Sequence, residues 1–303
     1  MKKNNIIAIA AIALTFTACS NDNDFTTNNE GKDTPISLSV GVGELSVVTR
    51  AESNTTTPLT TGALGLYITK NGDKNIIDKY LCNNAQFTYN NGWSCGTTYY
   101  WAADNATIDY VAYHPYQSSI SGNFISWDVT NQSSGNLDLL YENATGVANN
   151  DNHSIAITLG HVCSKLVVNV SKLGSEIASG TKITSIKIGG LKPKGTFSLT
   201  DKTWNSSNET AADIGMVKST TSTTTTSDIP ATYEAILIPQ TAPFTLTIRL
   251  SDNSEYQLAV PSHAFAAGTC YTLTIQVGQD KVTLGSITQT DWDPVPGGDL
   301  TAQ

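Results

Sequence analysis

Short apolar runs with a period of two residues, separated by turn residues, dominate the chain from residue 63 to residue 287. Alternate residues of a strand face opposite sides of a sheet, so these runs are typical of half-buried strands. The segments between them include Asn71-Gly72-Asp73, Asn90-Asn91-Gly92 and Ser121-Gly122-Asn123, which are residue types that favour turns. Regularly spaced short strands without long helical patterns predict an all-β fold of the β-sandwich type.

A break in composition at residues 171–180 divides the runs into two sets. The 303 residues are enough for two domains of ordinary size. We therefore predict an N-terminal β-sandwich over residues 36–172 and a C-terminal β-sandwich over residues 173–303. The strands predicted for the first are 63–69, 76–81, 86–89, 107–113, 124–129, 137–141, 154–159 and 162–170. Those predicted for the second are 182–188, 196–200, 232–239, 244–250, 256–260, 271–277 and 281–287.

The first residues have the pattern of an export signal. Lys2 and Lys3 precede an apolar run over residues 6–14, which is far shorter than the roughly 20 residues of a membrane-spanning helix. We expect a signal peptide over residues 1–18. The segment ending at Cys19 resembles a bacterial lipoprotein signal, and this resemblance implies lipid on the Cys19 sulfur, anchoring in a membrane and a lipidated tether over residues 19–35.

An alternating segment follows the tether. It predicts one strand whose apolar side chains share a face, namely Ile36, Leu38, Val40 and Val42. The residues after it are rich in Ser, Thr and Asn up to Thr61 and have no apolar period, which places Arg50 on an open loop. Exposed loops are preferred sites of proteolysis. The bond between Arg50 and Ala51 is thus a predicted cleavage site, and a cut there would make residues 36–50 a removable strand of the N-terminal sandwich. The alternative interpretation of Arg50 is a solvated loop cation.

Charge argues against one class of partner. The chain has 17 Lys and Arg against 26 Asp and Glu, a net charge of −9 at pH 7, and its lysines are scattered. Binding to nucleic acid needs a clustered basic patch. We predict no nucleic-acid partner.

Four cysteines remain besides Cys19, and an exported chain meets oxidising conditions. Cys82 and Cys95 flank an apparent hairpin and are candidates for a disulfide, as are Cys163 and Cys270. The alternative is four small buried apolar side chains. No Cys/His spacing predicts a metal site.

The usual catalytic motifs are missing from the sequence. Asp109, Asp128 and Asp138 lie on predicted strands and would resemble a glycosidase pair only if two of them met in space; solvation at the surface is the simpler interpretation. We predict no enzymatic activity, no metal and no cofactor. A group of aromatic residues permits either a sugar-binding platform or core packing: Tyr99, Tyr100, Trp101, Tyr110, Tyr113 and Tyr116.

Several motifs in order carry a family resemblance. They are Tyr99-Tyr100-Trp101, the segment 108–116 (Ile-Asp-Tyr-Val-Ala-Tyr-His-Pro-Tyr), the segment 137–141 (Leu-Asp-Leu-Leu-Tyr), the segment 161–166 (His-Val-Cys-Ser-Lys-Leu) and the ending from Ile287 to Trp292. Together they resemble the Bacteroidetes fimbrillin family, the Mfa-like branch of type V pilins. The resemblance implies two transthyretin-like β-sandwiches, export as an outer-membrane lipoprotein, trimming after an arginine, and assembly into pili by strand exchange.

The resemblance also implies partners. These are other pilin subunits, an arginine-specific protease and the outer membrane, contacted through the lipid. The donor strand is expected in the C-terminal region, where Val282, Leu284 and Ile287 are candidates. The alternative function is a surface carbohydrate-binding lipoprotein or tip adhesin with a ligand on a host or bacterial surface.

Overall fold

The computed structural model describes residues 34–43, 57–70, 80–101, 107–149, 151–173, 177–178, 180–219, 229–279 and 281–292. All regular elements of this part are strands, which confirms the predicted all-β class. Cys19, Arg50 and Ala51 lie outside the described residues. Within the described part, no helix has the length and apolar character that a membrane span requires.

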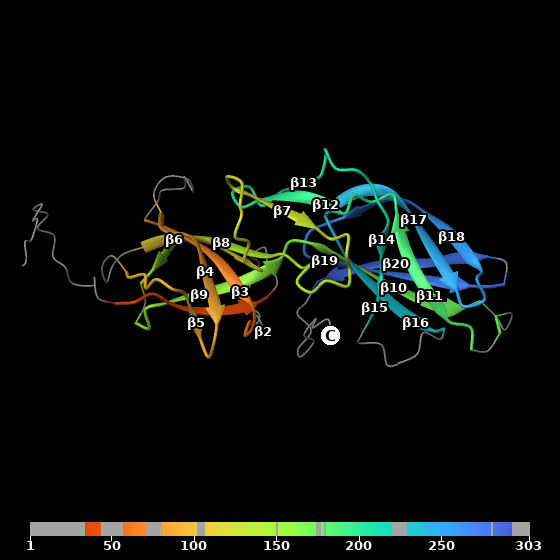
Figure 1. Ribbon diagram of the computed structural model, residues 1–303, viewed down its shortest axis with the longest axis horizontal. Coiled ribbons are helices and arrows are strands. Elements are labelled where there is room, and N and C mark those ends of the chain that lie inside the picture. Colours follow the sequence, from red (N-terminus) through yellow and green to blue (C-terminus); the bar gives the residue numbers. More distant parts are fainter. Residues whose placement is uncertain are drawn as a thin grey trace, which may run out of the picture.

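Eight strands form one sheet at one end of an elongated molecule (Figure 1). Its order is β2-β1-β9-β8-β6-β3-β4-β5. The bounds are β1 Ser37–Val42, β2 Thr57–Pro58, β3 Ala63–Lys70, β4 Tyr80–Tyr89, β5 Trp93–Ser94, β6 Thr107–His114, β8 Leu140–Ala148 and β9 Ser154–His161.

Two sheets pack face to face at the other end of the molecule. The five-stranded sheet has the order β15-β16-β10-β19-β20, and the four-stranded sheet has the order β14-β11-β17-β18. The first contains β15 Val217–Lys218, β16 Ala231–Leu237, β10 Ser164–Lys172, β19 Thr269–Val277 and β20 Val282–Asp291. The second contains β14 Ile214–Gly215, β11 Ile183–Gly189, β17 Gln240–Leu250 and β18 Glu255–Phe265.

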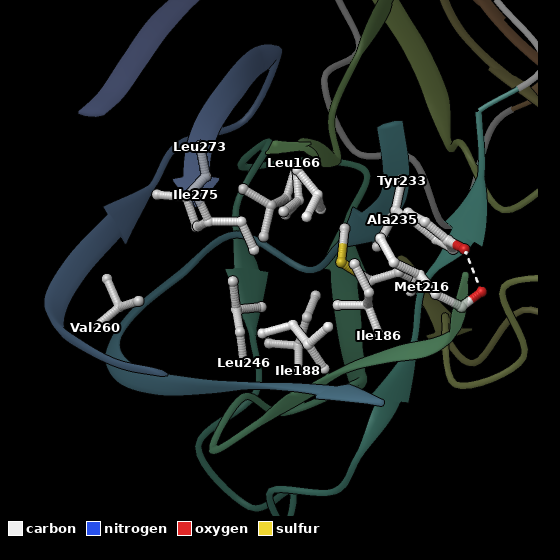
Figure 2. Packing of buried hydrophobic residues seen from close by; sticks show 14 of the residues in the cluster. Leu166, Ile186, Ile188, Met216, Tyr233, Ala235, Leu246, Val260, Leu273 and Ile275 are labelled. Atoms are coloured by element: carbon white, nitrogen blue, oxygen red, sulfur yellow. Dashed lines mark hydrogen bonds between the residues drawn. The ribbon is translucent and has the colours of Figure 1, made fainter. Parts of the chain in front are cut away.

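Alternating side chains of these two sheets meet in one buried cluster, which we call the C-terminal core (Figure 2). Leu166 of β10 and Leu273 of β19 face Ile186 of β11 and Leu246 of β17 across it. Every second residue is buried from Ser164 to Val170 of β10 and from Phe244 to Leu250 of β17. The period of two seen in the sequence therefore corresponds to one buried face on each strand.

The boundary that we predicted after Lys172 does not match the strand pairing. β10 pairs with β16 and β19, so residues 164–172 pack with the C-terminal strands. The composition break at 171–180 begins at the end of β10. The chain changes sheets earlier, between His161 at the end of β9 and Ser164 at the start of β10, where no turn motif marks the step.

A three-stranded sheet connects the two ends of the molecule. β7 Phe124–Asp128 pairs with β12 Lys194–Ser198, which pairs with β13 Trp204–Asn205. A second buried cluster, the junction core, lies here and takes residues from both halves of the chain, such as Tyr141 and Phe197. The Tyr141 hydroxyl donates to the Leu199 carbonyl at 2.5 Å, and the Trp204 indole donates to the Val162 carbonyl at 2.6 Å. These two hydrogen bonds connect the two halves of the chain across the junction.

The four described cysteines are free thiols, so the candidate disulfides, including Cys82 with Cys95, are not formed. The Cys82 thiol donates to the Leu66 carbonyl at 3.3 Å, and the Cys95 thiol to the Thr97 carbonyl at 2.7 Å. Burial raises the pKa of Cys82 to about 12. Cys82 and Cys163 are buried, in agreement with the alternative of small apolar side chains.

Candidate functional site

Strand β1, which covers all but the first residue of the alternating segment predicted from Ile36 to Val42, lies beside β9 (Figure 1). The two strands are parallel, and six consecutive pairs run from Ser37 with Ser154 to Val42 with Leu159 without a bulge. Backbone hydrogen bonds extend the ladder at both ends: Ser37 N donates to His153 O at 3.1 Å, and Gly43 N donates to Leu159 O at 2.9 Å. A segment at the start of the described chain therefore pairs with a strand more than a hundred residues later.

The other edge of β1 also has partners. Near its start, Ile36 N donates to Tyr99 O at 2.8 Å and Trp101 N donates to Thr34 O at 3.1 Å. Near its end, β1 pairs with the short strand β2, and Leu59 N donates to Val40 O at 3.0 Å. β1 thus bridges β9 on one side to segment 99–101 and β2 on the other.

The apolar side chains of β1 enter a third buried cluster, which we call the N-terminal core. Ile36 is 9% exposed and Val40 is 6% exposed, and the partly buried Leu38 and Val42 pack against the same cluster. Of the residues between them, Ser37 and Ser39 are exposed and Gly41 is buried. The predicted alternation is confirmed; that this strand is removed stays a prediction.

The far edge of β9 is almost without a neighbouring strand. β8 pairs with β9 only at Leu140 with His161 and at Tyr141 with Gly160. Among the described strands, residues 154–159 of β9 therefore pair with β1 alone. Removing β1 would leave this part of β9 without a ladder on either side.

Two side chains replace the missing ladder on the far edge of β9. The Glu142 carboxylate of β8 accepts a hydrogen bond from Thr158 N, and the Tyr110 hydroxyl of β6 donates to Ala156 O at 3.3 Å. Tyr110 and Glu142 also hydrogen bond to each other, and burial raises the pKa of both groups above their ordinary values. Sequence reasoning missed this pair, because a Glu in a polar stretch of strand gives no sign that it turns inward.

The candidate donor residues Val282, Leu284 and Ile287 lie on β20, the edge strand of the five-stranded sheet. β20 pairs with β19 in antiparallel direction, with an irregularity where Thr274 pairs with Ser286 but Ile275 pairs with Leu284. Val282 and Ile287 pack against the C-terminal core, while Leu284 is 37% exposed. The structure places these residues far along the molecule from β1 (Figure 1).

The residue that follows β20 is buried in the junction core. Trp292 is 8% exposed, and its N–H donates to Gly268 O at 2.9 Å. Its ring stacks on the imidazole of His161 with centroids 4.3 Å apart and planes 6° apart, and Lys165 Nζ lies 6.0 Å from the ring centroid. His161 Nδ1 is 2.6 Å from Asp138 Oδ2. Sequence gives no signal for this stack, because its members are far apart in the chain.

Comparison with known proteins identifies the family. The profile of the family described as "Fimbrillin-like" matches residues 49–292, which is most of the chain. The chain belongs to the fimbrillin-like family. Membership in this family makes it a fimbrial subunit, and it confirms the resemblance seen in the sequence.

Relatives of this fimbrillin-like chain match along nearly their whole length. A protein of Bacteroides uniformis named "Putative fimbrium subunit Fim1C" is 26% identical, and the alignment covers 99% of each chain. A crystal structure from Bacteroides uniformis, described as a "putative cell adhesion protein", is similar with a TM-score of 0.64 and 23% identity, over 85% of this chain and 99% of that one. A fimbrial protein from Bacteroides vulgatus has a TM-score of 0.55 and 16% identity, over 85% and 99%.

The aromatic residues considered for sugar binding do not form a platform in the fimbrillin-like fold. Trp101, Tyr110 and Tyr113 are buried, and of the six only Tyr100 is largely exposed, at 42%. Core packing, the alternative interpretation, accounts for the three buried members.

The three aspartates have separate partners. Asp109 accepts from Gly146 N at 2.7 Å, Asp128 accepts from Thr130 and pairs with Lys194, and Asp138 contacts His161. These contacts give no sign of a carboxylate pair. Over the described residues, no group of three His, Cys, Asp or Glu side chains is arranged to hold a metal ion.

Proposed function

We propose that this fimbrillin-like chain is a structural, non-enzymatic subunit of a cell-surface pilus, exported as an outer-membrane lipoprotein and assembled by β-strand exchange. In this proposal an arginine-specific protease cuts after Arg50, and a strand from another subunit takes the place of β1. The main observation that supports this proposal is the position of β1. It is the first strand of the described chain, joined to the rest through the segment that contains Arg50, yet it lies inside a sheet with partners on both edges.

The free energy gained by burying the apolar side chains of β1 supports the idea that removing β1 starts assembly. Four apolar side chains at about 1.5–3 kcal/mol each would contribute about 6–12 kcal/mol if all were fully buried. Leu38 and Val42 are only partly buried, so the lower part of that range applies before the entropy of ordering is subtracted. A typical domain is stable by about 5–15 kcal/mol. Losing β1 would therefore remove apolar burial of the same order as the lower part of a typical domain's net stability, before the entropy term is counted.

The backbone of the vacated site would also need a partner. Residues 154–159 of β9 and segment 99–101 would both lose hydrogen bonds that β1 now makes. An apolar strip beside unpaired backbone recruits another strand. Addition of a partner strand to such an edge is a known mode of recognition. We infer that the uncut chain, whose site is filled, stays a monomer.

The order of the sites along the chain links anchoring to assembly. The predicted lipid on Cys19, the tether 19–35 and β1 all precede Arg50. A single cut after Arg50 would therefore separate the subunit from its membrane anchor and from β1. The rest would form two packed units, up to residue 162 and from residue 163 onward, joined by the junction core.

The test is the composition of native fibres. Pili are sheared from cells of the producing strain, and the N-terminus of this chain in them is read by mass spectrometry. We expect a chain that begins at Ala51 and contains no residues of β1, and we expect Arg50→Gln to remain with the membrane and to be absent from the fibres. Arg249→Gln, a change at an exposed position of β17, is the matched control and should assemble normally. Fibres that contain residues 36–42, or assembly of the Arg50→Gln chain, would contradict the proposal.

A further inference from the structure

The site of β1 sets requirements for any strand that replaces it. The pairing with β9 is regular over six residues, without a bulge. Over residues 36–42, alternate positions face the N-terminal core, and Ile36 with three residues of β1 fills them with four apolar side chains. A replacement strand must therefore present four apolar residues at strictly alternate positions, because a shift of one residue turns every side chain to the other face.

β20 does not meet this requirement. Its apolar residues Val282, Leu284 and Ile287 pair with Val277, Ile275 and Leu273 of β19, which are all fully buried, but only Val282 and Ile287 pack against the C-terminal core. Ile287 shares the face of Leu284, three residues before it, only because the register shifts at Gly285. A bulge of this kind inserts one extra residue into a strand.

In a regular strand the apolar set of β20 would be divided. The face of Val282 and Leu284 would continue with Ser286 and Thr288, while Ile287 would lie on the opposite face. A regular β20 thus supplies two apolar side chains where β1 supplies four. Residues 293–303 do not supply the missing apolar side chains, because they contain two prolines and no alternating apolar set.

The end of β20 is also fixed within its own subunit. Trp292 is buried against His161, and its backbone N–H bonds to Gly268 O. Moving β20 out would uncover Trp292 and the buried row Leu273, Ile275 and Val277 of β19. Donation of β20 would therefore open the C-terminal core and the junction core together.

We propose that β20 remains in its own subunit, and that the strand replacing β1 comes from a different pilin chain rather than from a second copy of this one. That partner carries an extended segment with four apolar residues at alternate positions, and it has no proline where the ladder with β9 needs an N–H. The inference rests on the proposed strand exchange and adds the identity of its partner: the chain accepts a strand from a heterologous subunit.

Peptide binding to the cut protein tests the partner. The full chain is cut with an arginine-specific protease, the released fragment is washed out in mild urea, and fluorescent peptides are added. One peptide copies residues 34–43, one copies residues 281–292, and one copies 34–43 with Leu38 and Val40 replaced by Ser. We expect the first to bind, and the second and third to bind about 100-fold more weakly or worse, which is about 2.8 kcal/mol at 1.4 kcal/mol per factor of ten.

The outcomes separate this inference from the proposed function. Equal binding of the 281–292 and 34–43 peptides would overturn the heterologous partner and leave strand exchange intact. Failure of all three peptides to bind would overturn strand exchange itself, and this inference with it.

A disulfide across β19 and β20 gives an independent test in cells. Thr272 and Thr288 are paired residues of these strands, and changing both to Cys allows a link that holds β20 in place. Peptide mapping establishes that the introduced pair is joined, and the single Thr288→Cys chain is the control. We expect the joined chain to enter pili in the same amount as the control. A loss of tenfold or more, reversed by a reducing agent, would show that β20 must leave and would overturn the inference.

Discussion

β1 is the first strand of the described chain and β20 is the last, yet the two are built differently. β1 is regular, has partners on both edges and directs its apolar side chains into a core. β20 is an edge strand with a bulge, and most of its residues are exposed, but Trp292 directly after it is buried. The strand that is tightly held along its length is the one whose connection is predicted to be cut. The weakly buried strand is held at its end.

The difference indicates which of the two strands, when removed, would open a site for a partner strand. Removing β1 would take away the only strand partner that residues 154–159 of β9 have among the described strands. Removing β20 would uncover β19, which still pairs with β10. We expect β1 to act as the replaceable strand and β20 to close the C-terminal sandwich, and the following changes test that contrast.

The largest contrast comes from placing the same charge on each strand. Val40→Asp puts a carboxylate where the side chain is 6% exposed, while Leu284→Asp puts one where the side chain is 37% exposed. We expect Val40→Asp to lower the free energy of unfolding by more than about 4 kcal/mol, because apolar burial is lost and a charge is buried. Leu284→Asp should cost less than about 1 kcal/mol. Urea unfolding of the full chain measures both, and similar costs would refute the contrast.

A second change tests whether Trp292 holds the end of β20. Trp292→Ala should lower the free energy of unfolding by about 3–5 kcal/mol, the range for truncating a large buried aromatic side chain. Phe124→Ala, at a side chain that is 48% exposed, is the matched control and should cost less than about 1 kcal/mol. Hydrogen exchange should also show faster exchange of the β20 amides in Trp292→Ala. Unchanged exchange there would mean that Trp292 does not hold the strand.

The smallest effect concerns the far edge of β9, where Glu142 holds Thr158. Burial raises the pKa of Glu142 in the folded chain above its unfolded value, so the folded chain binds this proton more tightly. The stability from this group is complete below the unfolded pKa and is lost as pH rises through the raised folded pKa. Glu142→Gln cannot titrate but keeps an acceptor for Thr158 N. The unfolding free energy of Glu142→Gln minus that of the wild type should therefore rise with pH across this window.

Urea unfolding of both chains at a series of pH values measures this difference. A difference that stays constant with pH would show that Glu142 has the same pKa in the folded and unfolded chains.

Local patterns in the sequence predicted the local part of the structure. The alternation of Ile36, Leu38, Val40 and Val42 predicted both the strand and its buried face, because the period of two is fixed by strand geometry. The all-β class followed from many such runs. The strand predicted over residues 137–141 was placed too early, because β8 continues to Ala148 through polar residues that an apolar pattern does not mark.

Features that depend on distant residues were beyond the sequence. The parallel pairing of β1 with β9, the place of β10 in the C-terminal sheet, and the stack of Trp292 on His161 all join segments far apart in the chain. The inward turn of Glu142 depends on β8 separating from β9 after two pairs. The hydrogen bond from the Cys82 thiol to the Leu66 carbonyl likewise joins two different strands, β4 and β3. Lipidation at Cys19 and cutting between Arg50 and Ala51 stay predictions.

Hydrogen exchange along β9 tests the central claim most directly. Exchange of the amides of Ile155, Ile157 and Leu159, the alternate residues of β9 whose backbone faces β1, is compared in the intact chain, in the chain cut after Arg50 and freed of β1, and in the cut chain with the 34–43 peptide added. We predict protection in the intact chain, its loss over these residues on removal of β1 while the amides of β10 stay protected, and its return with the peptide. Protection that persists after β1 has left, or that the peptide does not restore, would contradict the account of β1 as a replaceable strand.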